Sequence, residues 1–192
     1  MSSIVANPRA LALDGTLVLT LRAADGAEIA RKRVAVTGHS LTVTFEGLAG
    51  LSLWTLDAPV LYRAEAALET TVGSDETSAR FGFRTAAFTA DGFLLNGEPL
   101  KIRGLNRHQS WPYVGYAMGK RTQVKDADLL KDVLKLNLVR TSHYPQSTYF
   151  LDRCDEIGLL VFEEIPGWQH LGPQVWQDES VENVRRMIER DW

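Results

Sequence analysis

From about Phe88 onward the sequence alternates short apolar runs with segments of helical periodicity, and few folds accommodate this alternation. Strands that alternate with helices form a parallel sheet with right-handed crossover connections. A run leading through Arg103 is the first predicted strand, and two more follow at Leu138–Thr141 and Leu159–Phe162. The predicted helices span Thr122–Leu136, Ser147–Ile157 and Ser180–Arg190. The order βαβαβα therefore predicts about three of the eight units of a closed (β/α)8 barrel.

The ends of these elements carry their own signals. Thr122 stands in the N-cap position of the first helix. Gly158 follows the second helix as a C-terminal stop, because glycine adopts the left-handed conformation readily. Asn96-Gly97 predicts a hairpin just before the first strand of the parallel sheet. The first helix has one apolar stripe, made of Val124, Leu129, Leu130, Val133 and Leu134.

The part of the chain before this region is β in character. Short runs with partial alternation of apolar and polar residues are separated by turn signals such as Asp25-Gly26, Thr37-Gly38, Glu46-Gly47 and Gly73-Ser74. Several such strands in under 90 residues favour an antiparallel sandwich of immunoglobulin-like type. We therefore predict two domains, an immunoglobulin-like β-sandwich over 1–87 and the N-terminal part of a TIM barrel over 88–192.

Composition excludes several classes of protein. The 192 residues are 45% hydrophobic and 23% charged, with a net charge of −3, which is ordinary for a soluble domain and disfavours nucleic-acid binding. No run approaches the roughly 20 apolar residues of a membrane span. The first residues show no export signal, so we expect a cytoplasmic protein. The single cysteine, Cys154, cannot form an intrachain disulfide and is expected in the core.

Polar and titratable residues follow each predicted strand of the second domain. Because the carboxyl ends of parallel strands carry the ligand site in such folds, we expect these side chains to gather there. Charged partners of hydroxyl groups, next to aromatic faces, suit a sugar ligand. Trp111, Tyr113, Tyr144 and Trp168 are the candidate aromatic platforms. The polar candidates are Asn106, Arg107 and His108 after the first strand, Arg140, His143 and Tyr144 at the second, and Glu163 and Glu164 after the third.

The residues alone leave other interpretations open. Arg103 and Arg140 are equally well explained as structural ion-pair partners of Glu163 or Glu164. Two histidines and a carboxylate also form metal sites, but no helical metal-binding spacing is present, and we expect no metal. His39 is given no role.

Four phrases together resemble glycoside hydrolase family 2, the β-galactosidase and β-glucuronidase group. They run in the family's order between about residues 50 and 172. LWTLDAPVLYRAEAAL and FGFRT are similar to the end of its sandwich domain. LLNGEPLKIRGLNRH is similar to the entry to its barrel, and RTSHYP with CDEIGLLVFEE to the next two strands.

This resemblance implies hydrolysis of a β-glycoside with retention, by two glutamates about 5 to 5.5 Å apart. In the family both glutamates lie beyond the helix in which this chain ends, so no catalytic residue is assigned before Trp192. No cofactor is implied. His108 and His143 would contact the sugar or stabilise the transition state, while Glu163 and Glu164 would line its subsite. The implied substrate-binding set is Asn106, Arg107, His108, Arg140, His143, Tyr144, Glu163, Glu164 and Trp168.

We therefore expect a β-glycosidase-like protein that is inactive or weak as this chain alone. One alternative is a weak glycosidase with an improvised site that uses Glu163 or Glu164 with His108 or His143 as acid and base. Glu163 and Glu164 are not expected to act together, because adjacent residues point to opposite faces of a strand. The other alternative is a carbohydrate-binding module without catalysis. Because the strand at 159–162 would be an exposed edge, we also expect a homo-oligomer.

Overall fold

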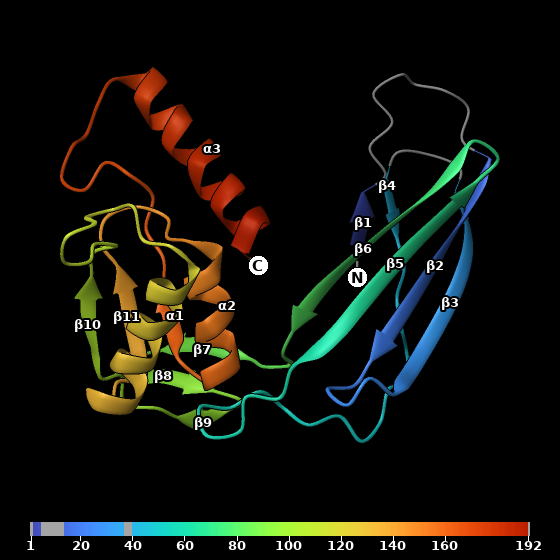
Figure 1. Ribbon diagram of the computed structural model, residues 1–192, viewed down its shortest axis with the longest axis horizontal. Coiled ribbons are helices and arrows are strands. Elements are labelled where there is room, and N and C mark those ends of the chain that lie inside the picture. Colours follow the sequence, from blue (N-terminus) through green and yellow to red (C-terminus); the bar gives the residue numbers. More distant parts are fainter. Residues whose placement is uncertain (1, 5–13, 37–39, 192) are drawn as a thin grey trace. The chain divides into compact units, whose positions relative to one another are not determined.

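The computed structural model describes residues 2–4, 14–36 and 40–191 (Figure 1). The chain divides into two compact units. The first comprises Met1–Trp54 and Val60–Phe83, and the second comprises Thr55–Pro59 and Arg84–Trp192. The short segment Thr55–Pro59 therefore leaves the first unit and packs with the second before the chain returns.

Antiparallel sheets make up the first unit. Strand β2 (Gly15–Arg22) lies between β3 (Glu28–Val36) and β5 (Tyr62–Thr70), and β6 (Gly73–Phe81) extends the sheet beyond β5. Strand β1 (Ser2–Ile4) pairs with β4 (Ser40–Thr42). The predicted turn at Thr37-Gly38 lies outside the described residues, and the predicted break at Gly73-Ser74 is instead the start of β6.

The core of this unit forms around the central strand β2. Leu17 and Leu19 are buried with Val36 and Val43. Leu41 and Phe45, which follow β3 along the chain, pack against the same cluster. Burial of each large aliphatic side chain contributes about 1.5–3 kcal/mol, so this cluster holds the sheet together.

The second unit opens with a hairpin of short strands. These are β7 (Ala86–Thr89), β8 (Gly92–Leu95) and β9 (Glu98–Pro99). Asn96 and Gly97 make the turn between β8 and β9 with φ of 55° and 84°. Both values lie in the left-handed region that an Asn-Gly turn supplies, so the predicted hairpin is confirmed.

A partial barrel follows the hairpin. Its strands β10 (Gly104–Arg107), β11 (Leu138–Thr141) and β12 (Leu160–Phe162) form a parallel sheet in that order. The helices are α1 (Lys120–Asp128), its π-helical continuation η1 (Leu129–Val133), α2 (Thr148–Ile157) and α3 (Gln174–Asp191). The predicted βαβαβα order is confirmed. No helix in the described part of the chain is both long and apolar enough to cross a membrane.

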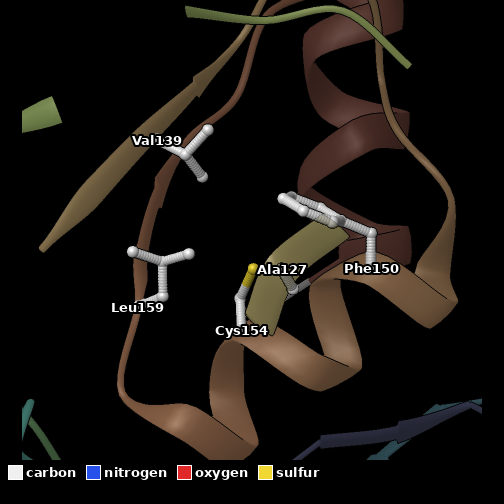
Figure 2. Close-up of a cluster of buried hydrophobic side chains, with 5 residues drawn as sticks. All are labelled: Ala127, Val139, Phe150, Cys154 and Leu159. Carbon is white, nitrogen blue, oxygen red and sulfur yellow. The ribbon is translucent and has the colours of Figure 1, made fainter. Parts of the chain in front are cut away.

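Helices α1 and α2 pack side by side against the parallel sheet (Figure 1). Figure 2 shows the core between them, where Ala127 and Phe150 from the helices meet Val139 of β11. Cys154 and Leu159 complete the cluster. Burial raises the pKa of the Cys154 thiol far above its usual range, so this residue is an inert core side chain, as its position on the apolar face predicts.

The helix boundaries correct two expectations. Helix α1 begins at Lys120 after Gly119, and Thr122 is not its cap, because its hydroxyl donates to the Gly119 carbonyl at 2.8 Å from inside the first turn. Helix α3 begins at Gln174, six residues before the predicted start. Helix α2 does end at Gly158, with φ of 72°.

The C-terminus of α2 is fixed by contacts with the segment Thr55–Pro59. The ammonium of Lys131, in η1, donates to the carbonyl of Leu56 at 2.9 Å and to that of Gly158 at 2.8 Å. Burial lowers the pKa of Lys131. A side chain at Gly158 would meet the Leu56 backbone, so only glycine fits this close approach.

Candidate functional site

The three parallel strands end side by side. In the register of the sheet Asn106 lies beside Arg140, and Arg140 beside Phe162. His108 follows β10, His143 follows β11, and Glu164 follows β12. Parallel pairing therefore brings together residues that lie up to 58 positions apart in the sequence (106 to 164).

His143 is the centre of this group. Its ring stacks on that of Trp168, with centroids 5.3 Å apart and an interplanar angle of 27°. The ring of His108 meets it edge-on at 5.4 Å. Nδ1 of His143 lies 2.8 Å from Oε2 of Glu164. One imidazole is thus held by an aromatic face, a second imidazole and a carboxylate.

The Glu164 carboxylate joins His143 to Arg140. Nε of Arg140 donates to Oε1 of Glu164 at 2.6 Å, and Nη2 donates to the same oxygen. Nη1 of Arg140 reaches Oδ1 of Asn106 at 3.4 Å. The proposed ion pair between Arg140 and Glu164 is confirmed, and it lies inside the candidate site rather than apart from it.

Tyr144 extends the aromatic wall. Its ring lies 6.2 Å from that of His108 and 6.0 Å from that of Tyr116. Its hydroxyl oxygen accepts the backbone N–H of Gln109 at 3.0 Å. Burial raises the pKa of Tyr144, so the hydroxyl stays protonated at neutral pH and can donate one further hydrogen bond.

Arg107 does not join this group. Its guanidinium is 4% exposed and donates to Asp126 at 2.5 Å, to Gln123 at 2.8 Å and to Gln146. It also lies 3.7 Å from the centroid of the Phe150 ring. Successive strand residues face opposite sides, so Arg107 enters the helix layer while Asn106 faces the other way.

Glu163 is also separated from its neighbour Glu164. It lies beside Asp191 and Arg190 at the end of α3. Burial, and then the charge of Asp191, raise the pKa of Glu163 to about 7, although Arg190 opposes this. The two glutamates therefore occupy different surroundings, as strand alternation predicts.

The loop after β10 holds two of the candidate aromatic platforms. Trp111 and Gly115 exchange backbone hydrogen bonds of 3.1 and 2.9 Å, which close the loop on itself. Tyr113 lies fully exposed in this turn, with φ of 71°. Of the candidate platforms, Tyr144 and Trp168 contact the histidine pair, whereas Trp111 and Tyr113 have no ring contact with it among the described residues.

Sequence reasoning missed two members of the group. Tyr116 contacts Tyr144, and its place in an aromatic-rich loop was the available signal. Thr141 accepts the backbone N–H of Glu164 at 3.2 Å, a contact that no local pattern reveals. Arg103, the other ion-pair candidate, is exposed, and no ion pair joins it to a described residue. Within the ranges that the structure describes, no three His, Cys, Asp or Glu residues are placed to hold a metal ion.

The family model for the TIM barrel domain of glycosyl hydrolases family 2 matches residues 87–191. A β-galactosidase of Thermoanaerobacterium thermosulfurigenes is 58% identical over 147 residues, which are 77% of this chain and 20% of that protein. A β-galactosidase of Rhizobium meliloti is 49% identical over 164 residues, or 84% of this chain and 22% of that protein. The chain thus spans about a fifth of the length of these curated relatives.

Solved structures agree with these sequence relatives. The crystal structure of a β-glucuronidase of Parabacteroides merdae superimposes with a TM-score of 0.88 at 30% identity. The superposition covers 97% of this chain and 24% of the other. The likeness therefore extends over both compact units, each of which has its counterpart in a much longer chain.

Proposed function

Because the chain belongs to glycosyl hydrolase family 2, we propose that it is part of an enzyme that hydrolyses terminal β-glycosides with retention of configuration. Within that enzyme it contributes the side of the active site that holds the sugar. The observation that carries this proposal is the group formed by His108, His143 and Trp168 around the Arg140–Glu164 pair. Paired donors and acceptors beside an aromatic face are what a sugar ring requires.

A β-galactoside is the favoured substrate. The relatives that are 49–58% identical are named β-galactosidases, while the β-glucuronidase structure is 30% identical. A glucuronide also carries a carboxylate, which favours an unshared cation in its site. Arg140, the arginine of the described group, is already bonded to Glu164 and is not an unshared cation.

The 192-residue polypeptide by itself is not expected to catalyse hydrolysis. Retention requires two carboxyl groups about 5 to 5.5 Å apart on either side of the glycosidic bond. Glu164 is paired with Arg140 and His143, and Glu163 turns toward Asp191. This divergence counts against an improvised site that uses both glutamates.

The test is hydrolysis of aryl β-galactoside and aryl β-glucuronide by the highly purified chain, beside its Glu163→Ala and Glu164→Ala variants. We expect no turnover from any of the three. Turnover that disappears in either variant would show that the described residues carry out catalysis, against the proposal. Equal turnover in all three would identify a contaminating host enzyme.

We also infer that the first unit, which takes up most of the predicted domain 1–87, forms an immunoglobulin-like sandwich and that the second unit, which contains 88–192, begins the barrel. Support for the sandwich comes from the antiparallel order β3-β2-β5-β6 and from Leu41 and Phe45, which pack against the core of that sheet. This domain precedes the barrel in the chain, and we assign it no catalytic role.

A further inference from the structure

Glu164 has both of its carboxylate oxygens engaged inside the protein. Oε1 accepts from Nε and Nη2 of Arg140, and Oε2 lies 2.8 Å from Nδ1 of His143. Its backbone N–H donates to the hydroxyl oxygen of Thr141, which is fully buried. The Glu164 side chain is only 19% exposed. Such a carboxylate is held in place by its neighbours and has little surface left for a ligand.

The contact between Glu164 and His143 fixes a proton. An ionised carboxylate only accepts hydrogen bonds, and Arg140 only donates them. The hydrogen bond at Oε2 therefore requires the proton on Nδ1 of His143, so that a neutral ring keeps its lone pair on Nε2. The hydrogen bond at Nδ1 thus determines that Nε2 carries no proton, as for histidines that bind metals or act as bases.

The surroundings of the ring leave Nε2 available. Trp168 covers one face of His143 at a 27° interplanar angle, and His108 contacts it edge-on. No residue that the structure describes forms a hydrogen bond with Nε2, and the side chain is 24% exposed. The ring of His143 is therefore oriented by packing, and Nε2 is its one nitrogen without a hydrogen-bond partner among the described residues.

We propose that Glu164 is a positioning residue that holds His143 in the Nδ1–H form, so that Nε2 accepts a hydrogen bond from a hydroxyl group of the bound sugar. This inference rests on the proposed function for the identity of the ligand. It replaces the expectation that Glu164 lines the sugar subsite directly. Glu164 acts on the sugar through His143, and Arg140 in turn holds Glu164.

The substitution Glu164→Gln makes the proposal testable without any activity. Arg140 cannot accept a hydrogen bond, so the amide oxygen of the new side chain must turn toward it. The amide NH2 then faces Nδ1 of His143, which has to become an acceptor. The proton moves to Nε2, and the tautomer of His143 inverts.

The measurement is a long-range ¹H–¹⁵N correlation spectrum of the labelled chain, at a pH where the imidazole is neutral. The chain has four histidines, and His143→Phe identifies the signals of His143. We expect the Nδ1–H tautomer in the unsubstituted chain and the Nε2–H tautomer in Glu164→Gln. Glu163→Gln is the matched control, because Glu163 faces Asp191, and it should leave the tautomer unchanged.

A double variant checks the mechanism. In Arg140→Met with Glu164→Gln the amide is free to rotate and can either donate to Nδ1 or accept from it, so the bias toward the Nε2–H form should weaken. An Nε2–H ring in the unsubstituted chain overturns the proposal without any variant. So does an unchanged tautomer in folded Glu164→Gln. If that variant does not fold, Glu164→Ala serves, and an Nδ1–H form that persists undiminished there overturns the proposal equally. Galactoside binding is measured separately, so failure of the proposed function remains distinguishable.

Discussion

The guanidinium of Arg107 is held inside the second unit by three side chains and the face of an aromatic ring. Gln123, Asp126 and Gln146 all direct oxygens at it. These partners come from α1 and from the segment before α2, so one residue at the end of β10 ties the strand to both helices. Arg107 therefore has a structural role, while its neighbour Asn106 contacts Arg140 in the candidate site.

Replacing Arg107 by Met should lower the free energy of unfolding by about 3 kcal/mol or more, because Asp126 would lose its partner in a largely buried position. Urea unfolding followed by circular dichroism measures this. Arg103→Met is the control, since Arg103 is exposed just before the same strand, and it should cost within about 0.5 kcal/mol. Equal losses in the two variants would contradict the role given to Arg107.

The raised pKa of Glu163 predicts that the stability of the folded chain depends on pH. Its pKa is about 7 in the folded chain, against an ordinary value of 4.5, so the folded state binds the proton more tightly than the unfolded state. The stabilising contribution of the protonated form is full below about pH 4.5 and is lost as the pH rises through about 7.

Glu163→Gln, which cannot ionise, should therefore lose less stability than the unsubstituted chain between these two pH values. Urea unfolding at both ends of the range gives the comparison. Glu179→Gln changes an exposed glutamate of α3 and should behave like the unsubstituted chain. Parallel pH profiles for Glu163→Gln and the unsubstituted chain would show that this carboxyl group is not the source.

At the scale of the elements, the junction of α2, η1 and the segment Thr55–Pro59 depends on two backbone carbonyls. Lys131 binds the carbonyls of Leu56 and Gly158 together, and the absence of a side chain at Gly158 lets the two segments touch. The left-handed conformation at Gly158 ends the helix at the same point. Both the end of α2 and the close contact with Leu56 therefore require glycine at position 158.

Gly158→Ala should be more destabilising than Gly97→Ala. Both glycines have positive φ, of 72° and 84°, and each substitution costs roughly 1–2 kcal/mol for that conformation. A methyl group at Gly97 meets nothing within 4 Å, whereas at Gly158 it meets the Leu56 backbone. Overpacking adds about 1–3 kcal/mol there. Equal unfolding free energies of the two variants would mean that the close approach is absent in solution.

Element types were predictable from sequence, but apart from the Arg140–Glu164 ion pair the side-chain partners were not. The helical stripe of α1 and the Asn96-Gly97 turn are local patterns, so they predict local structure directly. The π-helical turn at Leu129–Val133 and the early start of α3 have no such local signal in the sequence. For the site, strand ends located the candidates, but the partners of Arg107 and Glu163 depend on helices far along the chain.

At the scale of the whole molecule, the parallel sheet has strands β10 and β12 at its two edges. Phe162 on β12 is 51% exposed and Leu105 on β10 is 53% exposed. Exposed apolar edge strands favour pairing with another chain. We therefore propose that copies of this chain associate through the partial barrel.

Light scattering of the purified chain should give a mass above 21.4 kDa that falls on dilution. Phe162→Lys should shift the equilibrium toward the monomer, because a charged edge opposes pairing. Phe88→Lys changes an aromatic residue on the β7–β8 hairpin that is more exposed than Phe162, at 76%, and should leave the mass unchanged. A monodisperse monomer of the unsubstituted chain at high concentration would exclude association.

Ligand titration tests whether the residues around His143 form the sugar-binding side of a β-glycosidase site. The chain is titrated with a non-hydrolysable β-thiogalactoside while the ring signals of His108, His143 and Trp168 are followed by NMR. We predict saturable shifts of these signals at millimolar ligand, which His143→Ala weakens and Arg103→Met does not. Signals that stay unmoved in the folded chain throughout the millimolar range of ligand would show that these residues do not bind the sugar.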